Sequence, residues 1–271
     1  MAEKVRLGGM ALQNGVLVHG PTAWAVAVRT PEGELSLASG RKEVRGADVT
    51  NPLFRGPARL LDAVLLLPRI RRAQPAARLP FERPAVLGAM IATAVAVRLV
   101  RSSGLRPVAK ELLGSALSLA PAVLALRGTE LAEYHGAEHI TIGTYEHDEP
   151  RGKEHERCGS HLVGPMLLTS AVGAALAARA PEPLRGVARV AGTVGALVAA
   201  TELFSWMVRH PEHPVARALA RPGHEVQARF ATADPDPAQL EVAEAALAAC
   251  LELELESSDA ESNGAQHPAA G

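Results

Sequence analysis

The chain has 271 residues, of which 48% are hydrophobic and 3% aromatic, so its apolar mass consists mainly of Ala, Val and Leu. This composition favours closely packed helices over sheets and leaves room for membrane spans. The formal net charge of −1 excludes the basic excess of a nucleic-acid-binding protein, and the two distant cysteines, Cys158 and Cys250, exclude a disulfide framework and fit a reducing compartment.

Residues 1–53 predict a small soluble cap. They begin with charged residues and no long apolar run, so no cleavable signal peptide is expected. After a turn-rich stretch with several glycines, two short apolar runs, 22–29 and 34–38, flank a Pro-Glu-Gly turn. The sequence therefore predicts a β-hairpin within this cap.

Residues 54–80 mix leucines and valines with many arginines, including Arg55, Arg59 and Arg69. One interpretation is an amphipathic helix at a membrane interface, with arginines that extend their charged ends to water. The alternative is an ordinary surface helix of a globular domain.

Residues 81–210 contain the four apolar stretches 84–97, 112–126, 162–178 and 190–208. The first two are shorter than the roughly 20 residues that cross a hydrocarbon core, so they span it only if flanking arginines and lysines extend to the interface. Four spans would place the N-terminus, residues 127–161 and the C-terminus on one side. That side carries more Lys and Arg, which predicts that both termini are cytoplasmic.

Residues 211–255 predict a proline-rich loop and a soluble C-terminal helix. Asp236 can cap this helix, Pro237 fits its first turn, and apolar residues such as Leu240 and Leu247 follow at helical spacing. Residues 256–271 are poor in apolar side chains, which predicts a disordered tail. The expected fold is therefore mainly α: a multi-pass helical protein of the cell membrane with about four apolar helices, a hairpin cap and a soluble C-terminal helix.

Five of the ten histidines lie within the segment 130–161, together with several carboxylates and Cys158. His135, Glu138 and His139 stand at i, i+3 and i+4 and share one face of a helix. This H-x-x-E-H spacing is that of inverted zinc metallopeptidases, in which both histidines bind zinc and the glutamate acts on water. The pattern predicts His135 and His139 as metal ligands and Glu138 as the catalytic base.

A catalytic zinc site uses three protein ligands and an open position, so one further ligand is expected. Glu202, Glu146, His155 and Cys158 are the candidates. Glu202 interrupts an apolar run, which makes it a ligand, a proton relay or a partner of a histidine, unless the run does not span and the carboxylate reaches water. For Cys158 the preferred interpretation is a metal ligand, followed by an inert loop thiol and then by a nucleophile.

The most specific patterns are YHGAEH at 134–139, Tyr145-Glu146 and RCG at 157–159, and weaker ones lie at 8–21 and 227–236. In these patterns the chain resembles, from about residue 7 to 251, the YqhQ family (domain of unknown function 1385). This is a bacterial membrane family whose members are described as predicted metal-dependent enzymes.

The resemblance implies a multi-pass membrane protein with a metal site, and Glu202 falls where the family has a glutamate in its final apolar helix. Met10, Asn14 and His19 replace the Gln, Glu and Arg of the family's N-terminal pattern. If those positions touch the substrate, altered specificity or lost activity is expected.

These observations favour a metal-dependent membrane enzyme, with hydrolysis as a candidate reaction at the cytoplasmic membrane face. The expected cofactor is a divalent ion, with zinc favoured and iron or manganese as alternatives. The expected partners are membrane lipids and a small-molecule, lipid or peptide substrate, but no nucleic acid. Two other functions fit the same residues: a metal- or proton-coupled binding or transport protein, and a membrane scaffold with a structural metal.

Overall fold

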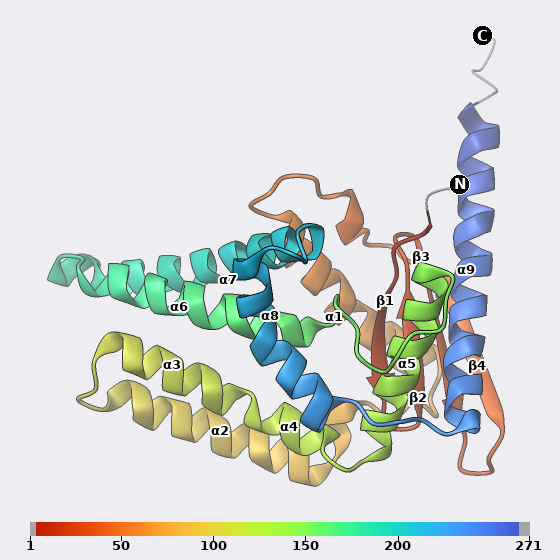
Figure 1. Cartoon of the computed structure of the whole chain (residues 1–271), viewed down its shortest axis with the longest axis horizontal. Helices are drawn as coiled ribbons and strands as arrows, with labels where there is room; N and C mark the ends of the chain where they lie inside the picture. Colours follow the sequence, from red (N-terminus) through yellow and green to blue (C-terminus); the bar gives the residue numbers. More distant parts are fainter. Residues whose placement is uncertain (1–3, 266–271) are drawn as a thin grey trace.

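A small α/β body lies at one end of four long apolar helices in the structure, a computed structural model that describes residues 4–265 (Figure 1). The predicted fold class is confirmed: the chain is mainly helical, with four candidate membrane spans, a small antiparallel sheet near the N-terminus and a C-terminal helix.

The sheet is antiparallel, and its strands lie in sequence order: β1 (Gly8–Leu12), β2 (Gly15–His19), β3 (Ala23–Arg29) and β4 (Leu35–Arg41). The predicted hairpin is β3–β4, joined by the turn that contains Gly33 at φ 84°. Strands β1 and β2 occupy the stretch whose glycines predict turns. At Gly15 the backbone of β3 lies so close that a Cβ atom would overlap the Ala27 carbonyl oxygen.

The two faces of the sheet bind different helices. Alternate side chains of the strands point to opposite faces. Leu17 and Val26 pack on one face with Leu66 of α1 (Arg55–Ala73). Val16 and its neighbours pack on the other face with α5 (Glu130–His147) and α9 (Pro237–Ala265). The body is therefore a three-layer sandwich, and α1 lies across the sheet from α5.

Helix α1 occupies the segment for which an amphipathic helix is predicted. Its buried residues include Asp62, Leu66 and Ile70, whereas Leu61 and Val64 are 56% and 57% exposed. One face of α1 thus packs on the sheet. That the other face lies at a membrane interface stays a prediction.

Four helical segments are long and apolar enough to cross a membrane, and at most 22% of the apolar window of each is buried. They extend beyond the apolar stretches seen in the sequence, so the two short stretches belong to segments of 19 and 20 residues. At 1.5 Å per residue, such a helix is about 30 Å long. The segments are Pro84–Ser102, Pro107–Leu126, Gly159–Ala178 and Glu182–Arg209.

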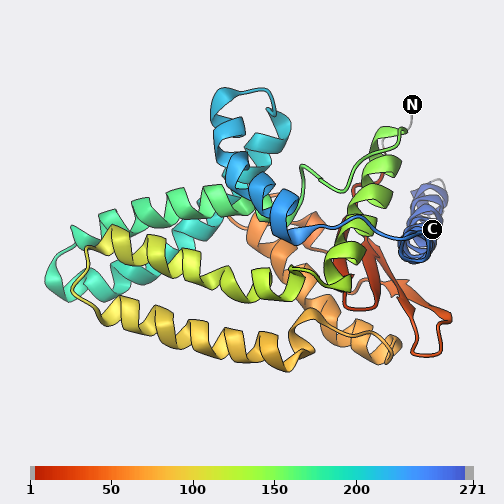
Figure 2. The same cartoon turned by 60° about the horizontal axis from the view of Figure 1, so that its bottom comes forward.

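These segments form two hairpins that lie side by side (Figure 2). The first consists of α2 (Pro84–Ser102), α3 (Pro107–Ser118) and α4 (Ala120–Leu126), and the second of α6 (Val163–Ala178) and α7 (Arg185–Arg209). Both hairpin turns lie at the end far from the sheet. Residues 127–161 and both ends of the described chain therefore lie at the same end of the bundle, as the sequence predicts, and their cytoplasmic location stays a prediction.

The chain returns to the body through α8 (Pro214–Val226), a short π-helix (Gln227–Ala231) and α9. Helix α9 continues to Ala265, ten residues into the segment predicted to be disordered, and residues 266–271 lie outside the described part. In the C-terminal half of α9, buried Glu254 accepts hydrogen bonds from the backbone N–H groups of Thr22 and Ala23. These bonds fix α9 to the start of β3.

Candidate metal centre

Helix α5 places His135, Glu138 and His139 on the face that is directed at β1 and the 150–161 loop. His139 is 2% exposed, Glu138 is 7% exposed, and His135 is half-buried. Gly136 allows the approach of the segment after the π-helix, because a Cβ atom there would overlap the Ala233 carbonyl oxygen. The glycine inside YHGAEH thus brings a distant part of the chain against the histidines.

Both histidines are oriented by backbone carbonyl groups. Nδ1 of His135 lies 2.8 Å from the Ala231 carbonyl oxygen, and Nδ1 of His139 lies 2.7 Å from that of Lys153. A carbonyl oxygen only accepts, so each Nδ1 carries the proton and each Nε2 keeps its lone pair. Burial lowers the pKa of His139, which favours this neutral form.

Cys158 completes a group that could hold a metal ion. Its Sγ lies 3.6 Å from Nε2 of His135. One potential ligand atom from each of His135, His139 and Cys158 lies within 4.8 Å of the others. Of the candidates for a third ligand, the structure therefore brings Cys158 to the pair; we call these three residues the His/Cys cluster.

Glu138 lies next to the cluster. One carboxylate oxygen is 3.8 Å from Nε2 of His135. Burial raises the pKa of this carboxyl group, and the nearby His135 and His155 oppose that shift. On its other side Glu138 meets Gly9 of β1, where a Cβ atom would overlap the carboxylate. Position 9 therefore has room for glycine alone.

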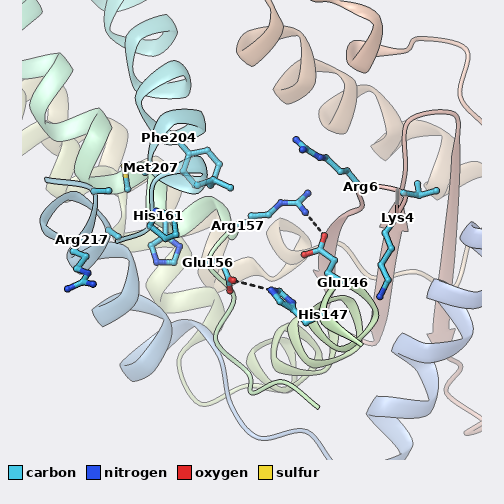
Figure 3. A pocket seen from close by; sticks show the side chains of 15 residues that line it. Lys4, Arg6, Glu146, His147, Glu156, Arg157, His161, Phe204, Met207 and Arg217 are labelled. Atoms are coloured by element: carbon cyan, nitrogen blue, oxygen red, sulfur yellow. Dashed lines mark hydrogen bonds and ion pairs between the residues drawn. The ribbon is translucent and has the colours of Figure 1, made fainter. Parts of the chain in front are cut away.

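Glu146 and His155 lie next to the cluster and bind each other. The His155 Nε2 atom is 3.1 Å from the Glu146 carboxylate. The same carboxylate also pairs with Arg157, as Figure 3 shows. Burial raises the pKa of Glu146, but the hydrogen bond from His155 and the charge of Arg157 lower it overall. The His155 ring centroid is 5.5 Å from that of His139. Neither Glu146 nor His155 belongs to the group of three that could hold an ion.

Glu202 is not brought to the cluster. It lies on α7 and binds the Arg55 guanidinium group, with Nε 2.7 Å from one carboxylate oxygen and a second bond to the other. The sequence pattern of a lone carboxylate in an apolar run did not indicate this partner, which lies 147 residues away in the chain.

Gln227 is a further residue of the site that only the family pattern marks in the sequence. This side chain is fully buried. Its oxygen accepts from the His155 N–H at 2.9 Å, and its nitrogen donates to Ser160 Oγ at 2.8 Å. The amide thus clamps the loop that carries Cys158. It does so from a π-helix, an irregularity that is frequent at functional sites.

The cluster lines a cavity of about 430 Å³. Arg157 lines this cavity and also lines a neighbouring cavity of about 410 Å³ with Arg6 and Phe204 (Figure 3). A second bond, from Arg157 Nη2 to the Leu7 carbonyl oxygen at 3.1 Å, fixes this arginine between the two.

The three positions that depart from the family pattern have separate environments. Met10 lines the cavity and also packs with Leu17 and Leu66 in the core on the α1 side of the sheet. Asn14 bonds to the backbone of residues 29, 76 and 78. His19 lies on the α1 side of the sheet, where its Nδ1 is 3.0 Å from Lys42 Nζ. His19 is thus separated by the sheet from the cluster.

Residues 129–253 match the model of a family described as "Protein of unknown function (DUF1385)". This match supports the resemblance over the segment that contains α5, the His/Cys cluster and Gln227, and its description names no activity. No curated protein and no solved structure matches the chain.

Proposed function

We propose that the protein is a metal-dependent membrane enzyme in which His135, His139 and Cys158 hold a divalent ion. One observation carries this proposal: both Nδ1 atoms are bound to carbonyl oxygens, so each Nε2 atom keeps its lone pair, and the Cys158 thiol lies beside the two rings. Histidines that ligate metals typically donate their other ring N–H in this way.

The donor set fits zinc. Two neutral imidazoles and a thiolate leave one position of a tetrahedral ion for water or substrate, as in catalytic zinc sites. The thiol favours zinc over manganese, which prefers carboxylate, carbonyl and water ligands. Iron remains the second choice.

Hydrolysis is the reaction that this arrangement supports best. When bound, the ion would act as a Lewis acid and lower the pKa of water. Glu138 lies within 3.8 Å of a cluster atom and can accept a proton there. Burial favours its protonated form, so it can hold that proton and return it to a leaving group. Gly9 leaves Glu138 the space for this position.

The transport alternative depended on Glu202 as part of an ion path. Glu202 instead binds Arg55 and is not in the group that could hold an ion. The geometry of the cluster, with a cavity on one side, favours a reaction site over an ion path.

Elemental analysis of the purified full-length protein tests the proposal. We expect about one zinc ion per chain in the wild type and in Glu138→Gln, and a large loss in His135→Ala, His139→Ala and Cys158→Ser. His210→Ala is the matched control, because this exposed histidine lies at the end of α7 and is outside the group. A wild type without stoichiometric metal, or a His135→Ala variant with unchanged metal content, would refute the site.

A further inference from the structure

One wall of the cavity beside the His/Cys cluster is apolar and belongs to the end of a candidate membrane span. Ala122, Ala125 and Leu126 of α4 line it, together with Leu131 and Ile142. Leu126 is the last residue of the span Pro107–Leu126. The cavity therefore lies where the apolar bundle meets the α/β body.

Another part of the lining is polar. It consists of His135, His139 and Cys158, with Glu138 and Arg157 beside them. The lining thus combines polar side chains of the cluster with apolar side chains of α4, which we call the polar end and the apolar end.

The α4 wall also continues to the outside of the bundle. Ala125 is 5% exposed, whereas Ala122, one turn earlier on the same helix, is exposed to the surroundings and still lines the cavity. Leu124, on the neighbouring face, is 48% exposed. An apolar chain can therefore run from the cluster along the two alanines to the outer surface of a candidate span.

We propose that the site takes an amphiphile, with its polar group at the His/Cys cluster and its alkyl chain along Ala122 and Ala125. This inference rests on the proposed metal site. A volume of about 430 Å³ lies within the range of small-molecule sites, and the small side chains of α4 provide the space for the chain. Apolar surface that leaves water on binding makes affinity rise with each methylene group, and this is the measurable consequence.

Two hydroxamates test it, because the hydroxamate group binds zinc whereas the alkyl chain can be varied. Acetohydroxamate and octanohydroxamate are titrated into zinc-loaded protein in detergent, and their dissociation constants are compared. We expect octanohydroxamate to bind at least about 100-fold more tightly, a lower bound for six added methylene groups at a few-fold each.

Variants distinguish binding of the alkyl chain in the cavity from its uptake by the detergent micelle. Ala122→Trp, at an exposed position that tolerates a large side chain, and the smaller change Ala125→Leu both fill the apolar end. We expect each to reduce the advantage of octanohydroxamate to less than about tenfold and to leave acetohydroxamate binding unchanged. Leu124→Trp is the matched control on the same helix and should retain the full advantage.

The outcomes distinguish the two proposals. Failure of both hydroxamates to bind a zinc-loaded protein would remove the open coordination position, and with it the proposed hydrolysis and this inference, while the metal content itself would still identify a metal site. Binding of acetohydroxamate without a chain-length advantage would overturn the inference and leave the metal site standing. A chain-length advantage that survives in both Ala122→Trp and Ala125→Leu would assign the effect to the detergent and also overturn it.

Discussion

The guanidinium group of Arg55, at the start of α1, binds both carboxylate oxygens of Glu202 on α7. Next to this pair, Gly56 contacts Thr201 so closely that a Cβ atom on the glycine would overlap the threonine hydroxyl group. Together these contacts join the fourth candidate span to the helix that covers the sheet. The carboxylate within the apolar run thus has a structural partner.

Glu202→Gln is expected to leave the zinc content unchanged and to lower the midpoint of thermal unfolding by a few degrees, because it weakens the contact between α1 and α7. Arg55→Ala should have the same effect on both quantities. Elemental analysis and thermal unfolding in detergent measure them. Loss of zinc in Glu202→Gln would make this residue a candidate ligand again.

Gly9→Ala is expected to displace the Glu138 carboxylate, because the added methyl group takes the space that the carboxylate occupies. Overpacking of this kind costs about 1–3 kcal/mol of unfolding free energy. Zinc content should persist, since the added methyl group meets Glu138 first, which is not one of the three cluster residues. Gly152→Ala is the control, because a methyl group added there meets nothing within 4 Å. Equal stability of the two variants would contradict the expectation.

Gln227→Ala is expected to lower zinc affinity by about tenfold, the low end of the effect of removing a partner of a ligand, because Gln227 holds the loop of Cys158 at His155 and Ser160 and not a ligand itself. It also leaves the buried His155 N–H without its acceptor, at a cost of about 1–3 kcal/mol. Gln74→Ala is the control: this buried amide binds Ser36 on the α1 side of the sheet, so its loss should cost stability alone. Competition with a chromophoric chelator measures the affinities, and equal zinc affinity in the two variants would show that Gln227 does not position the site.

The stability of the protein is expected to fall as the pH decreases from about 6.5 to about 4, because of His19. Burial, and next the charge of Lys42, lower its pKa in the folded protein to about 4, against 6.5 in the unfolded chain, while Asp62 opposes the shift. Between these values the unfolded chain binds a proton that the folded protein does not, so protonation favours unfolding. The change amounts to at most about 3 kcal/mol.

Thermal unfolding of wild type and His19→Asn across this pH range checks the assignment. The variant should show a shallower loss of stability between pH 6.5 and 4, and the two curves should run parallel below pH 4. Identical slopes in that window would assign the pH dependence to other groups.

Local patterns in the sequence predict a large part of the fold. The hairpin β3–β4 follows from two apolar runs around a Pro-Glu-Gly turn, and the four candidate spans follow from apolar length. Strands β1 and β2 are missed because Gly9 and Gly15 resemble turn residues. Their true role is to admit Glu138 and the backbone of β3, contacts with segments that the local pattern does not contain.

The sequence likewise predicts some residues of the candidate site and misses the contacts of others. His135, Glu138 and His139 come together by helical spacing alone, so the sequence predicts them as a set. Cys158 reaches His135 through a loop path that spacing does not determine, and Glu202 finds Arg55 on a helix far away in the chain. The sequence shows that a carboxylate in an apolar run needs a polar partner, but the identity of that partner depends on the tertiary fold.

The bond between His135 and the Ala231 carbonyl group also bears on how the protein is made. All three residues of the His/Cys cluster precede residue 159, but the carbonyl group that orients His135 follows the last candidate span by some twenty residues. During synthesis, the cluster residues are therefore in the chain long before their arrangement is complete. The bond that orients His135 can therefore form only after the whole of the final candidate span has been synthesised.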